Sequence, residues 1–350
     1  MRKTIIFMMA IVFAVSMLLI GAGCQKKAPV PEEAGEPAEE KAAVAEPKHF
    51  EGYKIWFDAG GTEGDPVSTV LMNGAMAAAN DFGVELTVYF SEWNPEKMIA
   101  NFKNAMAQSP DGIISNGIPG EDAFGPLIEE AFNKGVIFSL YAVDLPNIRA
   151  KFADKGMGYA GSDLYGSGYS LGKKSVELWD LGKGDRAMVW GLLAQEQRGV
   201  RGQGSIDALE EAGVTVDYIE ISDDVNADYV LGIPTFVSYY SSHPDVDLII
   251  TDHGGLTSTI KTFMEAAKLN PGDVNGAGFD LSAATADAIK SGYLGVVFDQ
   301  QLWYQAYLTV QQVCFSKAYG FAGVYTDTGS GFVDASNIDL VHPLVMEGIR

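Results

Sequence analysis

The chain has 350 residues, 47% of them hydrophobic and 20% charged, and its formal net charge is −22. The length favours two globular domains over one. The negative charge argues against nucleic acid and anionic membrane surfaces as partners, because phosphate groups would repel it. The two cysteines, Cys24 and Cys314, do not make a disulfide framework, and no Cys/His cluster has the spacing of a metal site. We therefore expect neither a metal nor a cofactor.

Residues 1–23 have the composition of an export signal. Two basic residues are followed by an apolar run, 5–20, that is too short for a comfortable membrane span. The small residues before Cys24 resemble the lipobox of bacterial lipoproteins, in which the cysteine is acylated and becomes the mature N-terminus, although Gly21 stands where that motif usually has leucine. We predict lipidation at Cys24. The alternative is an ordinary signal peptide followed by an incidental cysteine.

The segment that follows is rich in proline, alanine and glutamate and has no apolar periodicity. Such a composition cannot bury enough surface to fold, so we predict that residues 24–48 form the lipidated start and a disordered tether. A tether after an acylated cysteine suits a soluble domain that stands off a membrane in the cell envelope. One acyl chain anchors weakly, and stable anchoring takes more than one.

From residue 53 onward, short apolar runs alternate with segments of helical periodicity, which is typical of parallel α/β folds. Polar or glycine-rich turns follow the apolar runs, and Pro66 stands at the first position of a helix, where its missing N–H does no harm. In this first part the predicted strands are 54–57, 85–90, 112–115 and 136–141, and the predicted helices are 66–82, 95–108 and 121–133.

A polar interval, 146–156, interrupts this alternation, which then resumes to give a second α/β unit. Within the helix predicted at 227–242, Pro234 should cause a kink or mark the true start. The fold class is therefore α/β with two doubly wound lobes. The second set of predicted strands is 187–193, 215–220, 246–251, 277–279 and 294–298, and the predicted helices are 165–178, 199–212, 227–242, 256–268, 282–290 and 302–319.

The stretch 294–306 joins a buried strand to a helix through three polar side chains, Asp299, Gln300 and Gln301. In an open α/β sheet, ligands bind at the carboxyl ends of the strands. These side chains are rich in hydrogen-bond donors and acceptors, so we expect them close to a small polar ligand.

Several short motifs, taken in order along the chain, resemble those of the type I periplasmic solute-binding proteins, and more narrowly the ribose/galactose branch that feeds sugars to ABC transporters. The resemblance covers about the whole mature chain. The motifs that carry it are Gly64-Asp65-Pro66, the Asp-Gly-Ile-Ile run within 109–114, Tyr159-Ala-Gly-Ser-Asp163, His243-Pro-Asp-Val246, Thr251-Asp252, Gly278-Phe-Asp280 and the Asp-Gln-Gln-Leu-Trp-Tyr-Gln run at 299–305.

This resemblance implies two lobes joined by three crossings of the chain. The crossings would lie near 156–161, 299–301 and 325–329. The N-terminal lobe would comprise residues 50–156 plus 301–324, and the C-terminal lobe 157–300 plus 325–350.

The resemblance also implies a sugar site between the lobes. Carboxylates, amides and arginine suit vicinal hydroxyl groups, and aromatic faces suit ring C–H groups. Arg201 resembles the family's arginine because the segment 201–209 has the right spacing, and Arg198 is the near rival. Tyr141 is expected at the site as one candidate for stacking. The positions of the hydroxyl-binding residues are held by Asp65, Asp252, Asp280 and Gln300.

Some of these residues have other interpretations. Asp65 directly precedes Pro66 and could serve as a helix N-cap, and capping is also open to Asp252. The chain departs from the family where aromatics usually follow the first turn, and again after the fourth strand. At these places stand Val67, Ser68, Ala142 and Val143, so stacking would come from Trp93, Tyr141, Trp190 or Trp303.

We interpret the protein as a lipid-anchored receptor on the outer face of a membrane. It would be a monomer that closes its lobes around a monosaccharide or polyol and passes it to an ABC permease. A receptor that signals without transport, in chemotaxis or for a sugar-like autoinducer, is the alternative. The export signal and the missing helix-turn-helix argue against a related DNA-binding repressor.

An enzyme on a doubly wound fold is the remote alternative. Asp280 and Asp299 could in principle do acid–base work, but no nucleophile or metal set accompanies them, so we expect no catalytic residues. The glycines of 156–161 match a dinucleotide-binding pattern but follow no clear apolar strand, so we interpret them as a hinge loop.

Overall fold

The computed structural model describes residues 50–329 and 331–350. The predicted export signal, Cys24 and the tether lie outside these residues. Within them the backbone forms two six-stranded sheets. Counted in the order in which its strands occur along the chain, each sheet runs 2-1-3-4-5 with one further strand at the edge, which is a doubly wound order. The prediction of two doubly wound α/β lobes is confirmed.

The first lobe is built on the sheet β11-β5-β4-β3-β1-β2, in which every neighbouring pair is parallel. Strands β3 and β4 are buried along their whole length, as expected for a parallel sheet that helices cover on both faces. The strands are β1 (Lys54–Asp58), β2 (Glu85–Tyr89), β3 (Gly112–Asn116), β4 (Ile137–Tyr141), β5 (Tyr159–Gly161) and β11 (Tyr325–Asp327).

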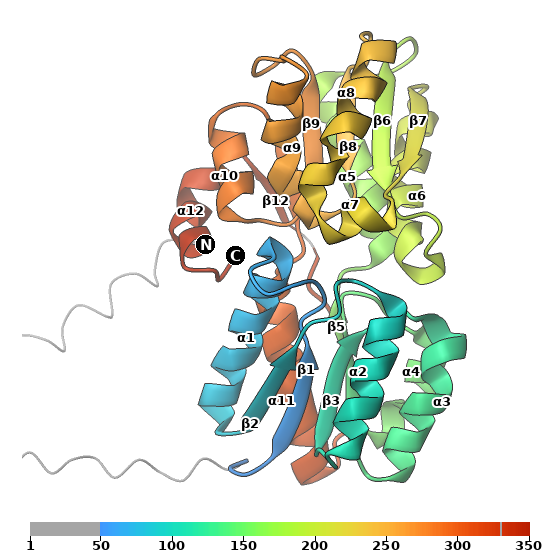
Figure 1. The fold of residues 1–350 in the computed structure, drawn as a ribbon, viewed down its shortest axis with the longest axis vertical. Coiled ribbons are helices and arrows are strands. Elements are labelled where there is room, and N and C mark those ends of the chain that lie inside the picture. The colour runs from blue at the N-terminus through green and yellow to red at the C-terminus, as the bar shows by residue number, and fades with distance from the viewer. Residues whose placement is uncertain (1–49, 330) are drawn as a thin grey trace, which may run out of the picture. The chain divides into compact units, whose positions relative to one another are not determined.

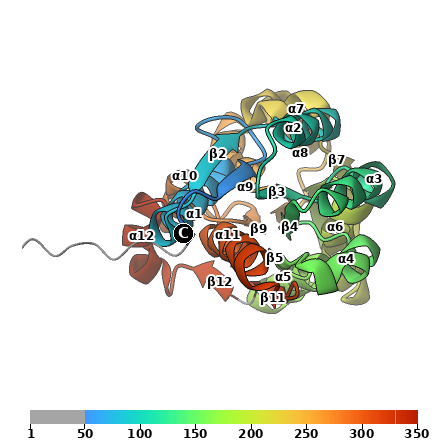
Figure 2. The ribbon, with the colours of Figure 1, turned by 90° about the horizontal axis from the view of Figure 1, so that it is seen from below.

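Helices cover both the first and the second face of this sheet (Figures 1 and 2). On the first face, α1 and α11 approach closely because Gly74 lacks a side chain: a Cβ there would lie 2.1 Å from the carbonyl oxygen of Trp303. The helices are α1 (Pro66–Phe82) and α11 (Leu302–Tyr319) on that face, and α2 (Pro95–Ala107), α3 (Gly120–Asn133) and α4 (Pro146–Phe152) on the other.

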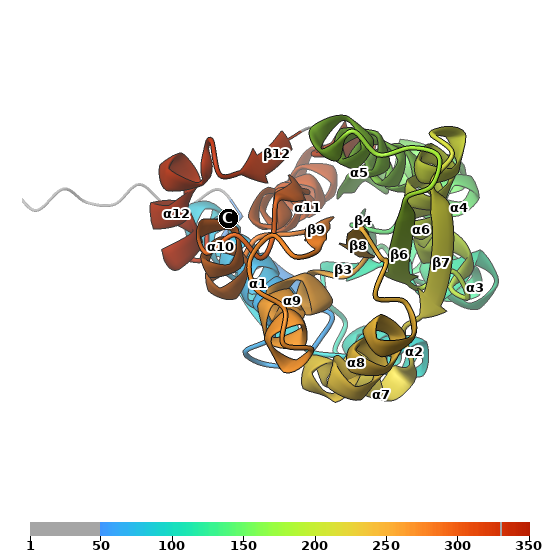
Figure 3. The same ribbon diagram turned by 90° about the horizontal axis from the view of Figure 1, so that it is seen from above.

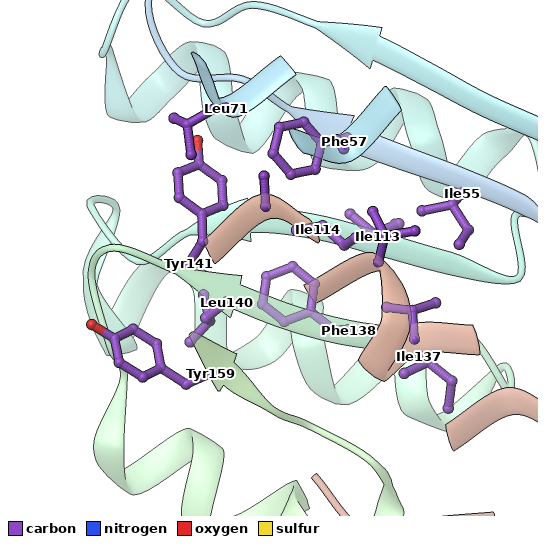
Figure 4. Close-up of a cluster of buried hydrophobic side chains, with 14 of the residues drawn as sticks. Ile55, Phe57, Leu71, Ile113, Ile114, Ile137, Phe138, Leu140, Tyr141 and Tyr159 are labelled. Carbon is purple, nitrogen blue, oxygen red and sulfur yellow. The ribbon is translucent and has the colours of Figure 1, made fainter. Parts of the chain in front are cut away.

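Apolar side chains of β1, β3 and β4 lie in the core of the first lobe, together with side chains of the covering helices (Figure 4). Phe57 and Tyr141 stack near the carboxyl ends of their strands, with ring centroids 5.4 Å apart and planes inclined by 17°. Leu71 of α1 lies close to the Tyr141 ring in Figure 4. The packed core therefore extends to the edge of the sheet where ligands bind.

The second lobe is built on the sheet β12-β10-β9-β8-β6-β7. Its edge strand β12 runs antiparallel to β10, and the other pairs are parallel. The sequence had predicted no element after helix 302–319. The strands are β6 (Arg186–Gly191), β7 (Thr215–Glu220), β8 (Leu248–Thr251), β9 (Asn275–Phe279), β10 (Val296–Asp299) and β12 (Gly331–Asp334).

Helices α5 and α6 pack together on one face of this sheet, and α8 and α9 lie on the other (Figure 3). Pro234 stands in the first turn of α8, so it marks the true start of the helix predicted from 227. The helices are α5 (Leu164–Trp179), α6 (Glu196–Glu211), α7 (Asp223–Ala227), α8 (Ile233–Ser242), α9 (Gly254–Ala266), α10 (Ala283–Lys290) and α12 (Ile338–Met346), with short 3₁₀ segments at Ala153–Lys155 and Tyr229–Gly232.

The chain passes between the two sheets at three places: after β5, after β10 and after β11. The predicted boundaries assigned 157–161 and 325–327 to the C-terminal lobe, whereas β5 pairs with β4 and with β11 in the first sheet. The polar interval before β5 is not a break, because it holds helix α4, which returns the chain to this sheet. By strand pairing, the crossings therefore follow Gly161 and Asp327.

A hydrogen-bonded group, which we call the hinge cluster (Ser162, Gln300, Gln305 and Thr328), ties the three crossings together. The Ser162 hydroxyl donates to Gln300 Oε1 at 2.9 Å, and the Thr328 hydroxyl donates to the Gln300 carbonyl at 2.8 Å. Gln305 Nε2 donates to the same carbonyl at 2.9 Å and to the Thr328 hydroxyl at 3.0 Å. All four side chains are buried.

Candidate functional site

A cavity with about 570 Å³ of empty space, including the part open to solvent, lies between the two lobes. Of the six predicted site residues, Tyr141, Arg201, Asp280 and Gln300 line it, whereas Asp65 and Asp252 do not. It lies where the carboxyl ends of β3, β4, β6, β8, β9 and β10 meet, which is the binding edge of a doubly wound sheet.

Asp252 follows β8 and holds two arginines of α6 in place. Arg198 Nη1 donates to Asp252 Oδ2 at 3.0 Å, and Arg201 Nε donates to Asp252 Oδ1 at 2.5 Å. Both guanidinium groups also donate to the Asp252 carbonyl. Asp252 is fully buried, and its contacts in this structure are with these arginines rather than with the cavity. It is not the N-cap of α9, because that position belongs to His253.

The arginine predicted by resemblance and its rival both line the cavity. The Arg201 guanidinium lies 3.8 Å from the centroid of the Phe279 ring, a cation–π contact that fixes its plane. Burial and the neighbouring Arg201 lower the pKa of Arg198, while Asp252 opposes this effect. The arginines are therefore a coupled pair whose orientation is set by one carboxylate and one aromatic ring.

Asp280 and Gln300 lie side by side at the ends of β9 and β10. Gln300 Nε2 donates to Asp280 Oδ1 at 2.7 Å. Burial raises the pKa of Asp280 to about 6, and the nearby Arg201 and the hydrogen bond from Gln300 oppose the rise. Asp280 has φ of 71°, a left-handed conformation that is uncommon outside glycine and often marks functional positions.

His253 and Trp93 line the cavity from opposite lobes, with ring centroids 5.9 Å apart. The Gly255 N–H donates to His253 Nδ1 at 3.0 Å. Burial and the two arginines hold the pKa of His253 well below its usual range, so the ring is neutral and Nε2 carries its proton as a donor. No sequence signal distinguished His253 from the other three histidines.

Of the four aromatic candidates for stacking, Trp93 and Tyr141 line the cavity. Trp93 packs against Gly60, where a Cβ would lie 2.0 Å from the indole ring. Trp190 is buried in the core of the second lobe, and Trp303 stacks on Tyr307 at 5.1 Å. The latter two belong to packing in this structure.

Two amide side chains of the second lobe carry unsatisfied oxygens at the cavity. Gln195 Oε1 and Asn226 Oδ1 are buried and have no hydrogen-bond partner among the described residues. Buried polar atoms are normally paired, so an unpaired acceptor in a cavity suggests a place for a donor. Gln195 stood in a polar turn after a predicted strand, but Asn226 lies in α7, which the sequence pattern did not reveal.

Asp65 is the N-cap of α1, where its Oδ1 accepts from the Ser68 N–H at 2.8 Å, so its capping interpretation is confirmed. Its second oxygen accepts from the Tyr229 hydroxyl of the second lobe at 2.5 Å. The same hydroxyl accepts from Trp93 Nε1 at 3.3 Å. Asp65 therefore contributes a contact between the lobes beside the cavity.

Two lobes on a three-crossing hinge, with polar side chains from both strand edges around one cavity, define a solute-binding protein of the hinged type. The Periplasmic binding protein domain matches residues 60–314, and the chain belongs to this family of solute-binding proteins. Within the described ranges, no helix combines the length and apolar character needed to cross a membrane.

The relatives extend the comparison. The xylose/arabinose-binding protein XylF of Sulfolobus acidocaldarius is 27% identical over 259 residues, covering 69% of this chain, which spans 61% of that protein. A carbohydrate transporter of Acidothermus cellulolyticus in complex with myo-inositol superposes with a TM-score of 0.71 at 20% identity, over 86% of this chain and all of that chain. A solute-binding protein of Burkholderia graminis in complex with D-arabinose superposes with a TM-score of 0.72 at 17% identity, over 83% of this chain and 98% of that chain. The two structures support the fold.

The substitution Asp252→Asn tests the role assigned to Asp252. It removes the carboxylate that balances Arg198 and Arg201, so we expect the free energy of unfolding to fall by about 3 kcal/mol or more, because buried charges are left unpaired. Asp245→Asn is the matched control, since Asp245 pairs with Arg186 at the surface and should cost less than about 1 kcal/mol. Urea unfolding measures both, and equal losses would contradict the assignment.

Asp58, at the end of β1, supports the loop that carries Trp93. Its Oδ1 accepts from the Gly60 N–H and from the Ser91 hydroxyl, both at 2.9 Å, while Oδ2 has no partner among the described residues. Burial raises the pKa of Asp58 from its ordinary 3.8 to about 7, against the effect of these hydrogen bonds. The protonated form is therefore the favoured one in the folded protein at mildly acidic pH.

This shift predicts a pH dependence of stability. Between pH 4 and pH 7 the folded state binds a proton at Asp58 that the unfolded state has lost, so the stability contribution of this group falls as the pH rises and levels off above 7. The upper limit of the fall is about 4 kcal/mol. Urea unfolding from pH 4.5 to 8 should show a steeper fall of stability in the wild type than in Asp58→Asn, which keeps the smaller contribution of Asp280, and parallel curves would refute the assignment.

Proposed function

We propose that the protein captures a neutral monosaccharide or similar polyol between its lobes and delivers it to the membrane permease of an ABC importer. The observation that carries the proposal is the set of side chains at the cavity, where Arg201, Asp280 and Gln300 lie beside two unpaired amide oxygens. Such groups bind vicinal hydroxyls. The names of the relatives, all carbohydrate-related, support it.

The balance of charge at the cavity favours a neutral ligand. Arg198 and Arg201 are offset by Asp252 and by Asp280 when it is ionised, so no excess charge awaits a counter-ion. An anionic ligand would have to compete with Asp252 for the guanidinium groups. A hydroxyl group can accept from an arginine N–H and donate to a carboxylate without disturbing this pairing.

Binding is coupled to closure because the ligand contacts residues of both lobes. A ligand that touches both lobes favours the closed state and shifts the population toward it. We propose the lobes as residues 50–161 plus 301–327 and 162–300 plus 328–350, which moves the predicted boundaries to the ends of β5 and β11. Gln300 belongs both to the hinge cluster and to the cavity, so it links ligand binding to lobe closure.

The proposal includes no catalysis. Asp280 binds Gln300 and Asp299 pairs with Arg350, so the two acids are engaged in different contacts. Among the described residues, no group of three or more His, Cys, Asp or Glu side chains could hold a metal ion. We propose a binding protein that acts as a monomer outside the cytoplasm.

Thermal unfolding against a broad panel of neutral sugars and polyols tests the function. At least one compound should raise Tm by several degrees, because binding to the folded state alone stabilises it. Arg201→Lys should weaken that binding at least tenfold, since lysine lacks the fork that contacts Asp252 and a hydroxyl together. Arg186→Lys, in a surface ion-pair cluster, is the control and should leave affinity unchanged. Absence of any shift, with no small molecule found by mass spectrometry in the purified protein, would defeat the proposal.

Membrane attachment through Cys24 is a separate proposal that rests on the sequence. Labelling with a palmitate analogue should mark the wild type and leave Cys24→Ser unlabelled, and the variant should leave the membrane fraction. Cys314→Ser is the matched control, because Cys314 is buried in α11 and should not affect labelling. Equal labelling of wild type and Cys24→Ser would refute acylation at this position.

A further inference from the structure

The two walls of the cavity differ in their capacity to bind hydroxyl groups. The wall contributed by the first lobe is mostly apolar, and that contributed by the second lobe is mostly polar. The apolar residues of the first wall are Val67, Leu71, Ile118, Ala142, Val143 and Leu302.

The polar side chains of the first wall are already engaged within the protein. The Tyr141 hydroxyl donates to the Asp58 carbonyl at 2.6 Å and accepts from Asn116 Nδ2 at 3.3 Å. Asn116 Oδ1 accepts from the Ile118 N–H at 3.0 Å. Trp93 Nε1 donates to the Tyr229 hydroxyl. These groups offer little to a ligand hydroxyl without giving up a partner.

The backbone of the same wall is also satisfied. The Ala142 N–H donates to the Ala160 carbonyl at 3.2 Å, and the Val143 N–H donates to the Tyr141 carbonyl at 2.6 Å. The Val143 carbonyl accepts from the Gly117 N–H at 3.0 Å. A ligand hydroxyl buried against this wall would therefore lose its hydrogen bonds to water and gain few from the protein.

The second wall has the opposite character. Gln195 Oε1 and Asn226 Oδ1 are buried acceptors without partners among the described residues. Asp280 uses one carboxylate oxygen for Gln300, and His253 uses only Nδ1, so each retains a free polar atom. Unengaged donors and acceptors are thus concentrated on the wall of the second lobe.

We infer that the ligand is a deoxy sugar, namely a 6-deoxyhexose, with its hydroxyl-rich edge on the second lobe and its methyl group against the apolar wall. This inference rests on the proposed function and narrows its ligand class. A methyl group at that wall gains from burial. The hydroxyl of the parent hexose at the same place stays unpaired and costs affinity.

Calorimetric titration of matched sugar pairs tests the inference. The pairs are L-fucose with L-galactose, L-rhamnose with L-mannose, D-fucose with D-galactose and 6-deoxy-D-glucose with D-glucose. For the pair that binds, we expect the deoxy sugar to bind about 10- to 100-fold more tightly, the range that an apolar pocket achieves against one added hydroxyl. If the parent hexose binds as tightly or more tightly, the inference is wrong while the proposed function stands. If none of these sugars binds but another sugar or polyol of the broad panel raises Tm, the inference is wrong while the proposed function stands. If no compound of that panel binds, the proposed function itself fails.

Variants of the apolar wall give an independent readout. Val67→Thr adds a hydroxyl to this wall with little change of shape, and should reduce the ratio of deoxy to parent affinity severalfold. Val143→Thr is a second variant for the case in which the first does not fold. Val324→Thr is the control, because Val324 is exposed and lies outside this cavity, and it should leave the ratio unchanged. An unchanged ratio in both wall variants would overturn the inference.

Discussion

The hydrogen bonds of Gln300 connect the hinge of this protein to its binding site. The side chain accepts from Ser162 at one crossing and donates to Asp280 at the cavity, while its carbonyl accepts from Thr328 at another crossing. A buried amide in such a network is costly to leave unpaired. One residue therefore contacts Asp280 and two other chain crossings, so the geometry of the site is coupled to that of the hinge.

Much of this arrangement could be predicted from the sequence because its signals are local. Apolar runs bounded by polar turns predicted the strands, and Asp280 and Gln300 directly follow two of them. The rule that parallel strands present their carboxyl ends at one edge then placed both residues at a common site. The doubly wound order follows from the same alternation of strands and helices. The sequence pattern could not predict which hydrogen-bond or ion-pair partner each side chain has.

The partners depend on contacts between residues far apart in the chain. Asp252 and Arg201 are 51 residues apart, and their pairing explains why this acid serves the arginines and not the cavity. Asn226 lies in a short helix with no apolar period, and His253 becomes a donor through burial and a bond to the backbone N–H of Gly255. Strand β5 was misplaced because its three residues carry too little pattern, and only pairing with β4 assigns them.

In the binding mode proposed above, the asymmetry of the cavity gives the two lobes different contributions to binding. Hydrogen bonds to the second lobe are directional and set the orientation of a ligand, whereas burial against Val67, Leu71 and Val143 depends on area. The hydrogen bond of Tyr229 to Asp65 also joins the two lobes, and it involves no ligand. In the proposed mode, the second lobe selects the ligand and the apolar wall of the first lobe adds the free energy that favours the closed state, since that area leaves water only when the lobes meet.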